Sequence, residues 1–169
     1  LRGGELHSAE SGYSTFDQST PQGLVDGAVH SVISDSSRDR LLIGSRYGIT
    51  VMDPFDGSSA IHELPPGLEM YTMERWLPGD LDFLLIGTNV GFHFVSLDNG
   101  IPDMSTLSDS ELGPINEIVE FDTGSGNLDL IIFGNSSSWT LTMSIVEDTA
   151  EISAPVFNEA MSMILAAAA

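Results

Sequence analysis

The sequence LLIGSRYGI at residues 41–49 recurs as LLIGTNVGF at residues 84–92, 43 positions further along the chain. In both copies an apolar run ends in Gly and a small polar residue, and a second Gly closes a short turn. Apolar runs of this length between Gly and polar residues are typical of strands, and a Gly at the strand end permits a bend. The stretch therefore predicts two strands joined by a tight turn, occurring twice.

The repeat continues on both sides of these nine residues. A short apolar strand precedes each copy, at residues 29–34, 72–77 and 115–121. The third copy continues with LIIFGN at 130–135 and WTLTMSI at 139–145. Weak, polar fourth strands are expected at residues 59–64, 103–107 and 150–153. Four strands in each unit of about 40–50 residues form the pattern of a β-propeller blade.

The predicted fold is all-β, with blades of four antiparallel strands: about three blades plus the inner strand of a fourth. The expected units are an N-terminal segment or outer strand of a preceding blade (1–22), then blades at 23–67, 68–112 and 113–155, and a fourth beginning at 156–169. Closed propellers use about four to eight blades, so the ring is incomplete. Such a stack would expose an apolar face at each end. Either the chain is a piece of a longer propeller, which the terminal run Ala166–Ala169 favours, or copies associate.

The composition narrows the class of partner. The chain has 25 acidic residues against five Arg, no Lys and no Cys, and its net charge is −20. This charge repels nucleic acids and anionic lipid surfaces, so basic or cationic partners are expected. No apolar run approaches the length of about 20 residues that crosses a bilayer, so membrane insertion is not expected. Composition alone does not decide the compartment.

The residues around the first copy resemble a known repeat. VHSVISDSSRD at 29–39, followed by LLIGSRYGITVMD at 41–53, is similar to two-component-regulator propeller repeats, the periplasmic sensing part of hybrid sensor kinases. Leu42 and Leu85 stand where that pattern has Trp. The resemblance implies a ligand-sensing propeller and favours an extracytoplasmic location.

A second resemblance is to calcium-looped propeller repeats of the integrin-alpha type, carried by GDLDFLLIGTNVG at 79–91 and GSGNLDLIIFGN at 124–135. With Asp129 aligned as the last calcium ligand, the first, third and fifth loop positions are Phe121, Thr123 and Ser125. Calcium requires about six to eight oxygen ligands, and Phe121 offers none. Neither a metal nor a cofactor is therefore predicted.

The repeat predicts a binding rim rather than a catalytic site. The four His lack metal-site spacing, and no nucleophile or phosphate-binding motif occurs. A 43-residue register superposes Glu74 and Glu117, and nearly Glu159, at the start of the innermost strand, where a propeller has the mouth of its central channel. Turns at the same end present further side chains: Arg46, Tyr47, Asn89 and Asn135. We expect this rim to favour a small cationic or sugar ligand; the alternative is that the Glu side chains are only solvated.

Three function classes remain open. The first is a non-enzymatic propeller segment that binds a ligand or a protein partner, or scaffolds the remainder of a larger propeller, and the lack of catalytic motifs favours it. The second is a structural subunit of a surface or multi-protein assembly, including a homo-oligomer. The third is a propeller enzyme acting on polysaccharide.

Overall fold

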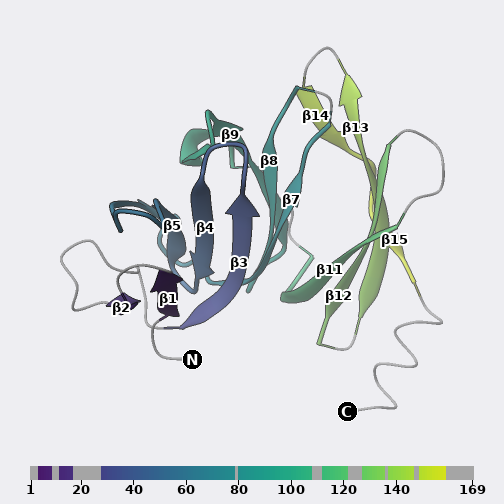
Figure 1. Ribbon diagram of the computed structural model, residues 1–169. Helices are drawn as coiled ribbons and strands as arrows, with labels where there is room; N and C mark the ends of the chain where they lie inside the picture. The colour runs from purple at the N-terminus through teal and green to yellow at the C-terminus, as the bar shows by residue number, and fades with distance from the viewer. Residues whose placement is uncertain are drawn as a thin grey trace.

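The structure is a computed structural model that describes residues 4–8, 12–16, 28–78, 80–107, 112–121, 127–135, 137–146 and 149–158. In these residues every regular element is a strand except one short 3-10 helix. The strands form three larger antiparallel sheets, which Figure 1 shows side by side, and a separate two-stranded hairpin. The all-β prediction is confirmed.

The three larger sheets share one strand order, which follows the chain. The first contains β3 (Val29–Asp35), β4 (Arg40–Ser45), β5 (Gly48–Met52) and β6 (Ser59–Glu63). The second contains β7 (Met70–Trp76), β8 (Phe83–Thr88), β9 (Phe92–Asp98) and β10 (Ile101–Asp103). The third contains β11 (Ile115–Phe121), β12 (Leu128–Gly134), β13 (Ser138–Val146) and β14 (Thr149–Ile152). The hairpin near the N-terminus pairs β1 (Gly4–Ser8) with β2 (Gly12–Phe16).

The first strands of the three sheets lie next to one another. β7 contacts both β3 and β11, so these three strands form the inner edge of the stack. Each carries a β-bulge near its start, at Val29/Ser31, Met70/Thr72 and Ile115/Glu117. The recurrence of one bulge at one place shows that the sequence repeat is a structural repeat, and the stack is an open set of propeller-type blades.

Two apolar cores fill the spaces between the sheets. Leu42 and Val51 of the first sheet pack with Leu84 and Ile86 of the second. On the other side, Phe83 and Phe92 of the second sheet pack with Ile132 and Leu141 of the third. All six residues of β8 are buried, because alternate side chains of this strand point into the two cores. The apolar run of β8 therefore follows from its having a neighbouring sheet on both sides.

The predicted fourth strand at residues 103–107 is wrong. The strand β10 ends at Asp103, and Met104–Thr106 form the 3-10 helix η1. The carboxylate of Asp103 accepts hydrogen bonds from the backbone N–H of Ser105 at 3.0 Å and from its hydroxyl at 2.6 Å. Asp, Ser and Thr side chains that bond to nearby backbone in this way favour a capped turn over a strand.

The segment predicted to begin a fourth blade at 156–169 lies partly outside the described residues. Its described strand, β15 (Val156–Phe157), pairs with β13 and so extends the third sheet. The rings of Phe157 and Trp139 meet edge to face, with 6.3 Å between their centroids, and this aromatic contact across the strands holds β15 in place.

Apolar side chains are exposed on the two outward faces of the stack. Val32 alternates along β3 with Ile33, which packs toward the second sheet, and Val32 is 58% exposed. On the third sheet, Val119 alternates with the buried Ile118 and is 40% exposed. The ends of the stack therefore present apolar surface, as the open arrangement predicts.

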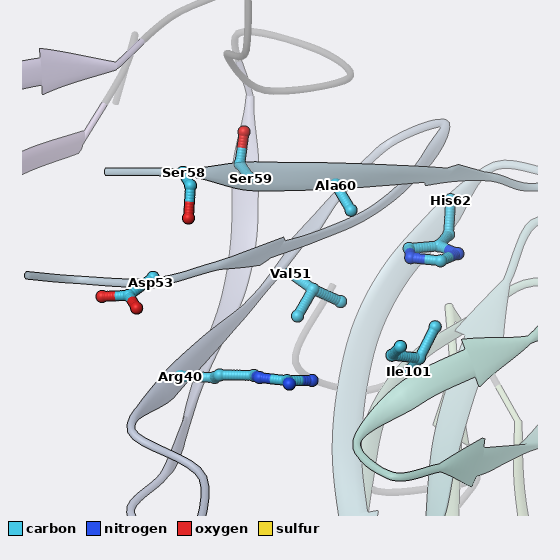
Figure 2. Close-up of a pocket in the computed structure, with 8 residues that line it drawn as sticks. All are labelled: Arg40, Val51, Asp53, Ser58, Ser59, Ala60, His62 and Ile101. Carbon is cyan, nitrogen blue, oxygen red and sulfur yellow. The ribbon is translucent and has the colours of Figure 1, made fainter. Parts of the chain in front are cut away.

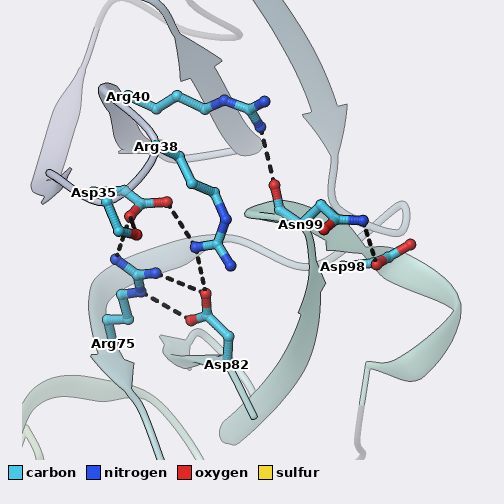
Figure 3. Close-up of polar contacts among 8 residues, drawn as sticks. Asp35, Arg38, Arg40, Arg75, Asp82, Asp98 and Asn99 are labelled. Atoms are coloured by element: carbon cyan, nitrogen blue, oxygen red, sulfur yellow. Dashed lines mark hydrogen bonds and ion pairs between the residues drawn. The ribbon is translucent and has the colours of Figure 1, made fainter. Parts of the chain in front are cut away.

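An ion-pair network joins the first and second sheets, as Figure 3 shows. Arg75 on β7 donates two hydrogen bonds to the carboxylate of Asp82, at 2.8 and 2.7 Å, and lies 3.2 Å from Asp35 at the end of β3. Arg38, in the β3–β4 turn, lies within 3.0 Å of Asp35 and 3.1 Å of Asp82. The Asp35 and Asp82 side chains are only 1% and 6% exposed, so charge pairing replaces their hydration.

The network lowers the pKa of Asp35. Burial by itself raises the pKa of this carboxyl. Hydrogen bonds from Ser37, Arg38 and Arg75 together lower the pKa by more than burial raises it, so the net shift is downward. A lowered pKa in the folded state stabilises the fold at every pH above the ordinary carboxyl value. This contribution is lost as the pH falls through the lowered value.

Replacing Asp82 by Asn is expected to lower the free energy of unfolding by about 3–5 kcal/mol, because Arg75 and Arg38 lose a buried counter-charge. Urea unfolding at pH 7 measures the effect. Glu69→Gln, which breaks the more exposed ion pair with Arg46, is the control and should cost about 1 kcal/mol or less. Equal costs for the two variants would contradict the role given to the network.

Gly87 and Gly44 occupy equivalent places but differ in what surrounds them. A Cβ at Gly87 would lie 2.7 Å from Cγ2 of Thr72 and 2.8 Å from the backbone oxygen of Ile115 in the third sheet. A Cβ at Gly44 would approach only the flexible ends of two Met side chains, Met70 at 3.1 Å and Met73 at 3.3 Å. We expect Gly87→Ala to cost about 1–3 kcal/mol in urea unfolding, and Gly44→Ala clearly less. The reverse order would show that the sheets are spaced differently.

Candidate functional site

The β4–β5 turn presents Arg46 and Tyr47 at one end of the first sheet. The guanidinium of Arg46 donates a hydrogen bond to the Glu69 carboxylate at 2.7 Å and lies 5.3 Å from the centroid of the Tyr47 ring. Tyr47 is 45% exposed. The result is an aromatic ring at the surface with its neighbouring cation held in a fixed position.

Asn89, in the β8–β9 turn of the second sheet, joins the same group. Its side-chain oxygen accepts from the backbone N–H of Glu69 at 2.9 Å, and its side-chain nitrogen donates to the backbone oxygen of Gly67 at 3.0 Å. The backbone N–H of Met70 donates to the oxygen of Arg46 at 2.8 Å. We call Arg46, Tyr47, Glu69 and Asn89 the rim cluster. Sequence reasoning found three of its members, and the structure brings these three together.

Glu69 is the member that sequence reasoning missed. It immediately precedes β7, and Met70 pairs with Thr88 at the end of β8, so the start of β7 and the β8–β9 turn share one end of the sheet. The signal in the sequence that could have identified Glu69 is its position immediately before the inner strand. The prediction chose Glu74 instead, which lies within β7 and further from that end of the sheet.

The remaining predicted rim residues do not join this cluster. Asn135 accepts a hydrogen bond from the side chain of Asn116 at 2.6 Å, within the third sheet. Glu159 lies outside the described residues. Asn135 thus belongs to the corresponding end of another blade.

Glu74 and Glu117 are close to each other but are not equivalent, so the 43-residue register is wrong for the inner strands. Glu74 pairs with Leu85, two positions beyond the bulge, whereas Glu117 lies at the bulge of β11. The bulges give the offset between the two inner strands: Met70/Thr72 of β7 corresponds to Ile115/Glu117 of β11, 45 positions further on (115 minus 70), so Glu117 is equivalent to Thr72 and not to Glu74. The 43-residue offset holds between β4 and β8, where Gly44 and Gly87 pair in the same way. It does not carry over to the inner strands, because the connecting segments differ in length from blade to blade.

Three carboxylates gather where the inner strands of the second and third sheets meet. Glu74 shares the face of Trp76, which packs toward the third sheet, and Glu120 shares the face of Ile118, which packs toward the second. Partial burial, followed by the negative charges of Glu120 and Glu117, raises the pKa of Glu74. Partial burial also raises the pKa of Glu120. We call Glu74, Glu117 and Glu120 the inner acidic group.

The inner acidic group does not amount to a metal site. Within the described ranges, no three His, Cys, Asp or Glu side chains are grouped so that they could hold a metal ion. The arrangement concentrates negative charge at the inner edge, and such a place attracts the cationic side chains or ammonium groups of a partner.

Comparisons with known proteins bear on the fold. No family model matches the sequence, and no curated protein matches it. A crystal structure of BBS1N in complex with ARL6DN is similar, with a TM-score of 0.57 and 12% identity, over 92% of this chain and 45% of that chain. BBS1N is a propeller, so this chain is an all-β protein of propeller-type blades that spans less than half of the BBS1N chain. No helix in the part that the structure describes is long and apolar enough to cross a membrane.

Replacing Glu74 by Gln is expected to raise the free energy of unfolding at pH 7. The pKa of Glu74 is raised in the folded state, so its ionised form destabilises the fold above that value. The penalty begins as the pH rises above the ordinary Glu value, and it is absent below that value. Urea unfolding from about pH 3.5, roughly one unit below the ordinary pKa of Glu, to about pH 7 measures the effect.

The expected curves for Glu74→Gln and the unmodified protein coincide at the acid end and separate toward neutrality. Glu63→Gln, on the outer strand β6 of the first sheet, is the control. A gain from Glu74→Gln that is equally large at both ends of the pH range would show that charge repulsion is not its source.

Proposed function

We propose that this chain is a non-enzymatic segment of a β-propeller that binds a protein partner through its rim cluster. The observation that carries the proposal is the exposed Tyr47 ring with the Arg46 guanidinium beside it. A hydrogen bond to the Glu69 carboxylate holds this guanidinium in place. Tyr and Arg are the residue types that most often dominate binding energy at protein interfaces. Side chains that are ordered before binding lose less conformational entropy in the complex.

The way in which the rim cluster is built supports this use. It stands on two sheets that the ion-pair network and an apolar core hold together, so its members keep their spacing. Loops fixed to a rigid scaffold are the common location of binding residues. BBS1N, a propeller of similar architecture, was crystallised in complex with ARL6DN, which is an example of such a scaffold with a protein partner.

The charge of the chain suggests the chemistry of the partner. A net charge of −20, to which the inner acidic group contributes, favours a basic protein surface over an acidic one. A small cationic ligand at the inner acidic group is the second candidate, because partly buried carboxylates with raised pKa values are stabilised by a positive neighbour.

A photo-crosslinking amino acid at position 47, in the native polypeptide that contains these residues, is expected to capture a specific protein. Position 55 is the matched control, because Phe55 is also an exposed aromatic residue, 80% accessible, but it lies in the turn at the opposite end of the first sheet. Tyr47→Ala should weaken binding of the captured protein by roughly thirtyfold, and Phe55→Ala by about twofold or less.

Equal capture at both positions, or unchanged affinity of Tyr47→Ala, would contradict the proposal. Capture of a second copy of this chain at position 47 would show self-assembly instead of partner binding. That outcome would favour the alternative function, a structural subunit of an assembly.

A further inference from the structure

A cavity of about 420 Å³ lies between the outer part of the first sheet and β10 of the second, as Figure 2 shows. Val51, Ala60 and Ile101 provide its apolar lining. Its size falls within the range of about 300–1,000 Å³ that is common for small-molecule sites. All of its lining residues lie in the first and second sheets or in the β5–β6 turn, so the cavity is complete without any further blade.

Arg40 lines this cavity and differs from the other three arginines that the structure describes. Arg38, Arg46 and Arg75 each form an ion pair with a carboxylate, whereas no described carboxylate lies within ion-pair distance of Arg40. Its guanidinium donates a hydrogen bond to the backbone oxygen of Asn99 at 3.1 Å (Figure 3). A guanidinium has five N–H donors, so most of them stay available to a ligand. An unpaired cation is unusual in a chain with a net charge of −20.

His62 supplies a second unused polar group. Its Nε2 atom is buried and has no hydrogen-bond partner among the residues that the structure describes. A buried polar atom without a partner costs free energy, and a ligand atom can remove that cost. Burial lowers the pKa of His62, so the ring is neutral at pH 7 and can donate a hydrogen bond without adding charge. Figure 2 shows the His62 ring and the Arg40 guanidinium both on the side of Ile101.

Asp53 lies at the other end of the cavity, as the same view shows. One of its carboxylate oxygens accepts hydrogen bonds from the backbone N–H groups of Phe55 at 2.7 Å and Asp56 at 3.4 Å. The cavity therefore has a positive side at Arg40 and a negative end at Asp53, with apolar surface between them. The positive side attracts one anionic group, the negative end repels a second one, and the apolar surface between them favours an uncharged body.

We propose that this cavity binds a small organic monocarboxylate, with its carboxylate on Arg40 and His62 and its apolar body against Val51, Ala60 and Ile101. Guanidinium and carboxylate form charge-assisted hydrogen bonds, which are the stronger class. The site is distinct from the rim cluster and shares no residue with it, so either one can fail without the other.

Hexanoate and hexanamide, which have the same chain length, test the proposal in the native polypeptide with labelled Ile methyl groups. Hexanoate is expected to shift the Ile101 methyl signal in a saturable way, and hexanamide is expected not to, because it lacks the charge. Arg40→Gln should weaken hexanoate binding by roughly tenfold or more, and Arg40→Lys should restore part of it. Arg46→Gln, at the rim, is the matched control and should leave it unchanged.

Adipate, which carries a second carboxylate at the far end, probes Asp53. We expect adipate to bind more weakly than hexanoate, and the difference to shrink in Asp53→Asn, because like charges repel. Absence of a saturable Ile101 shift with hexanoate, equal binding of hexanamide, or an Arg40→Gln variant that is folded and binds normally would each overturn the proposal. The unchanged methyl signals of the two cores report whether each variant is folded.

Discussion

Burial of β8 on both faces is the constraint on which the rest of the structure depends. Leu84 and Ile86 point into one core, and Phe83 and Leu85 point into the other, so the second sheet has no outward face of its own. A strand of this kind cannot be stable in an isolated sheet, because half of its apolar surface would remain in water. The neighbouring sheets are therefore part of its folding unit, and the turns that carry the rim cluster are fixed by that packing.

The parts of the fold that depend on local pattern were predictable from the sequence. Apolar runs such as LLIG mark the second strand of each blade, and the Gly that follows marks its end, because these features follow from pleat and backbone geometry alone. The turn residues Arg46, Tyr47 and Asn89 were found for the same reason: their place in the repeat fixes the end of the sheet at which they lie. The approach failed at residues 103–107, where local hydrogen bonds of Asp103 outweigh a weak strand pattern.

What the sequence could not show are the relations that depend on loop length and on contacts between blades. The inner strands of the second and third sheets are 45 residues apart (115 minus 70) and not 43, so Glu74 is not at the level of Glu117, although the two remain close enough to interact. The pairing of Arg75 with Asp35 and Asp82 spans two sheets. That Arg40 has no carboxylate partner within the described ranges is apparent only once the other ion pairs are known. Such facts are properties of the assembled stack, not of any segment.

The boundary between the first and second sheets differs in chemistry from the boundary between the second and third, so the two ends of the stack are not equivalent. All four arginines that the structure describes lie at the boundary between the first and second sheets, where Arg38 and Arg75 cross-link it ionically. The other boundary depends on apolar contact, and carboxylates of Glu74 and Glu120 repel each other at its inner edge. Proteins open first where their local stability is lowest. We therefore expect the third sheet to separate first as denaturant is added, while the ion pairs still join the first two sheets.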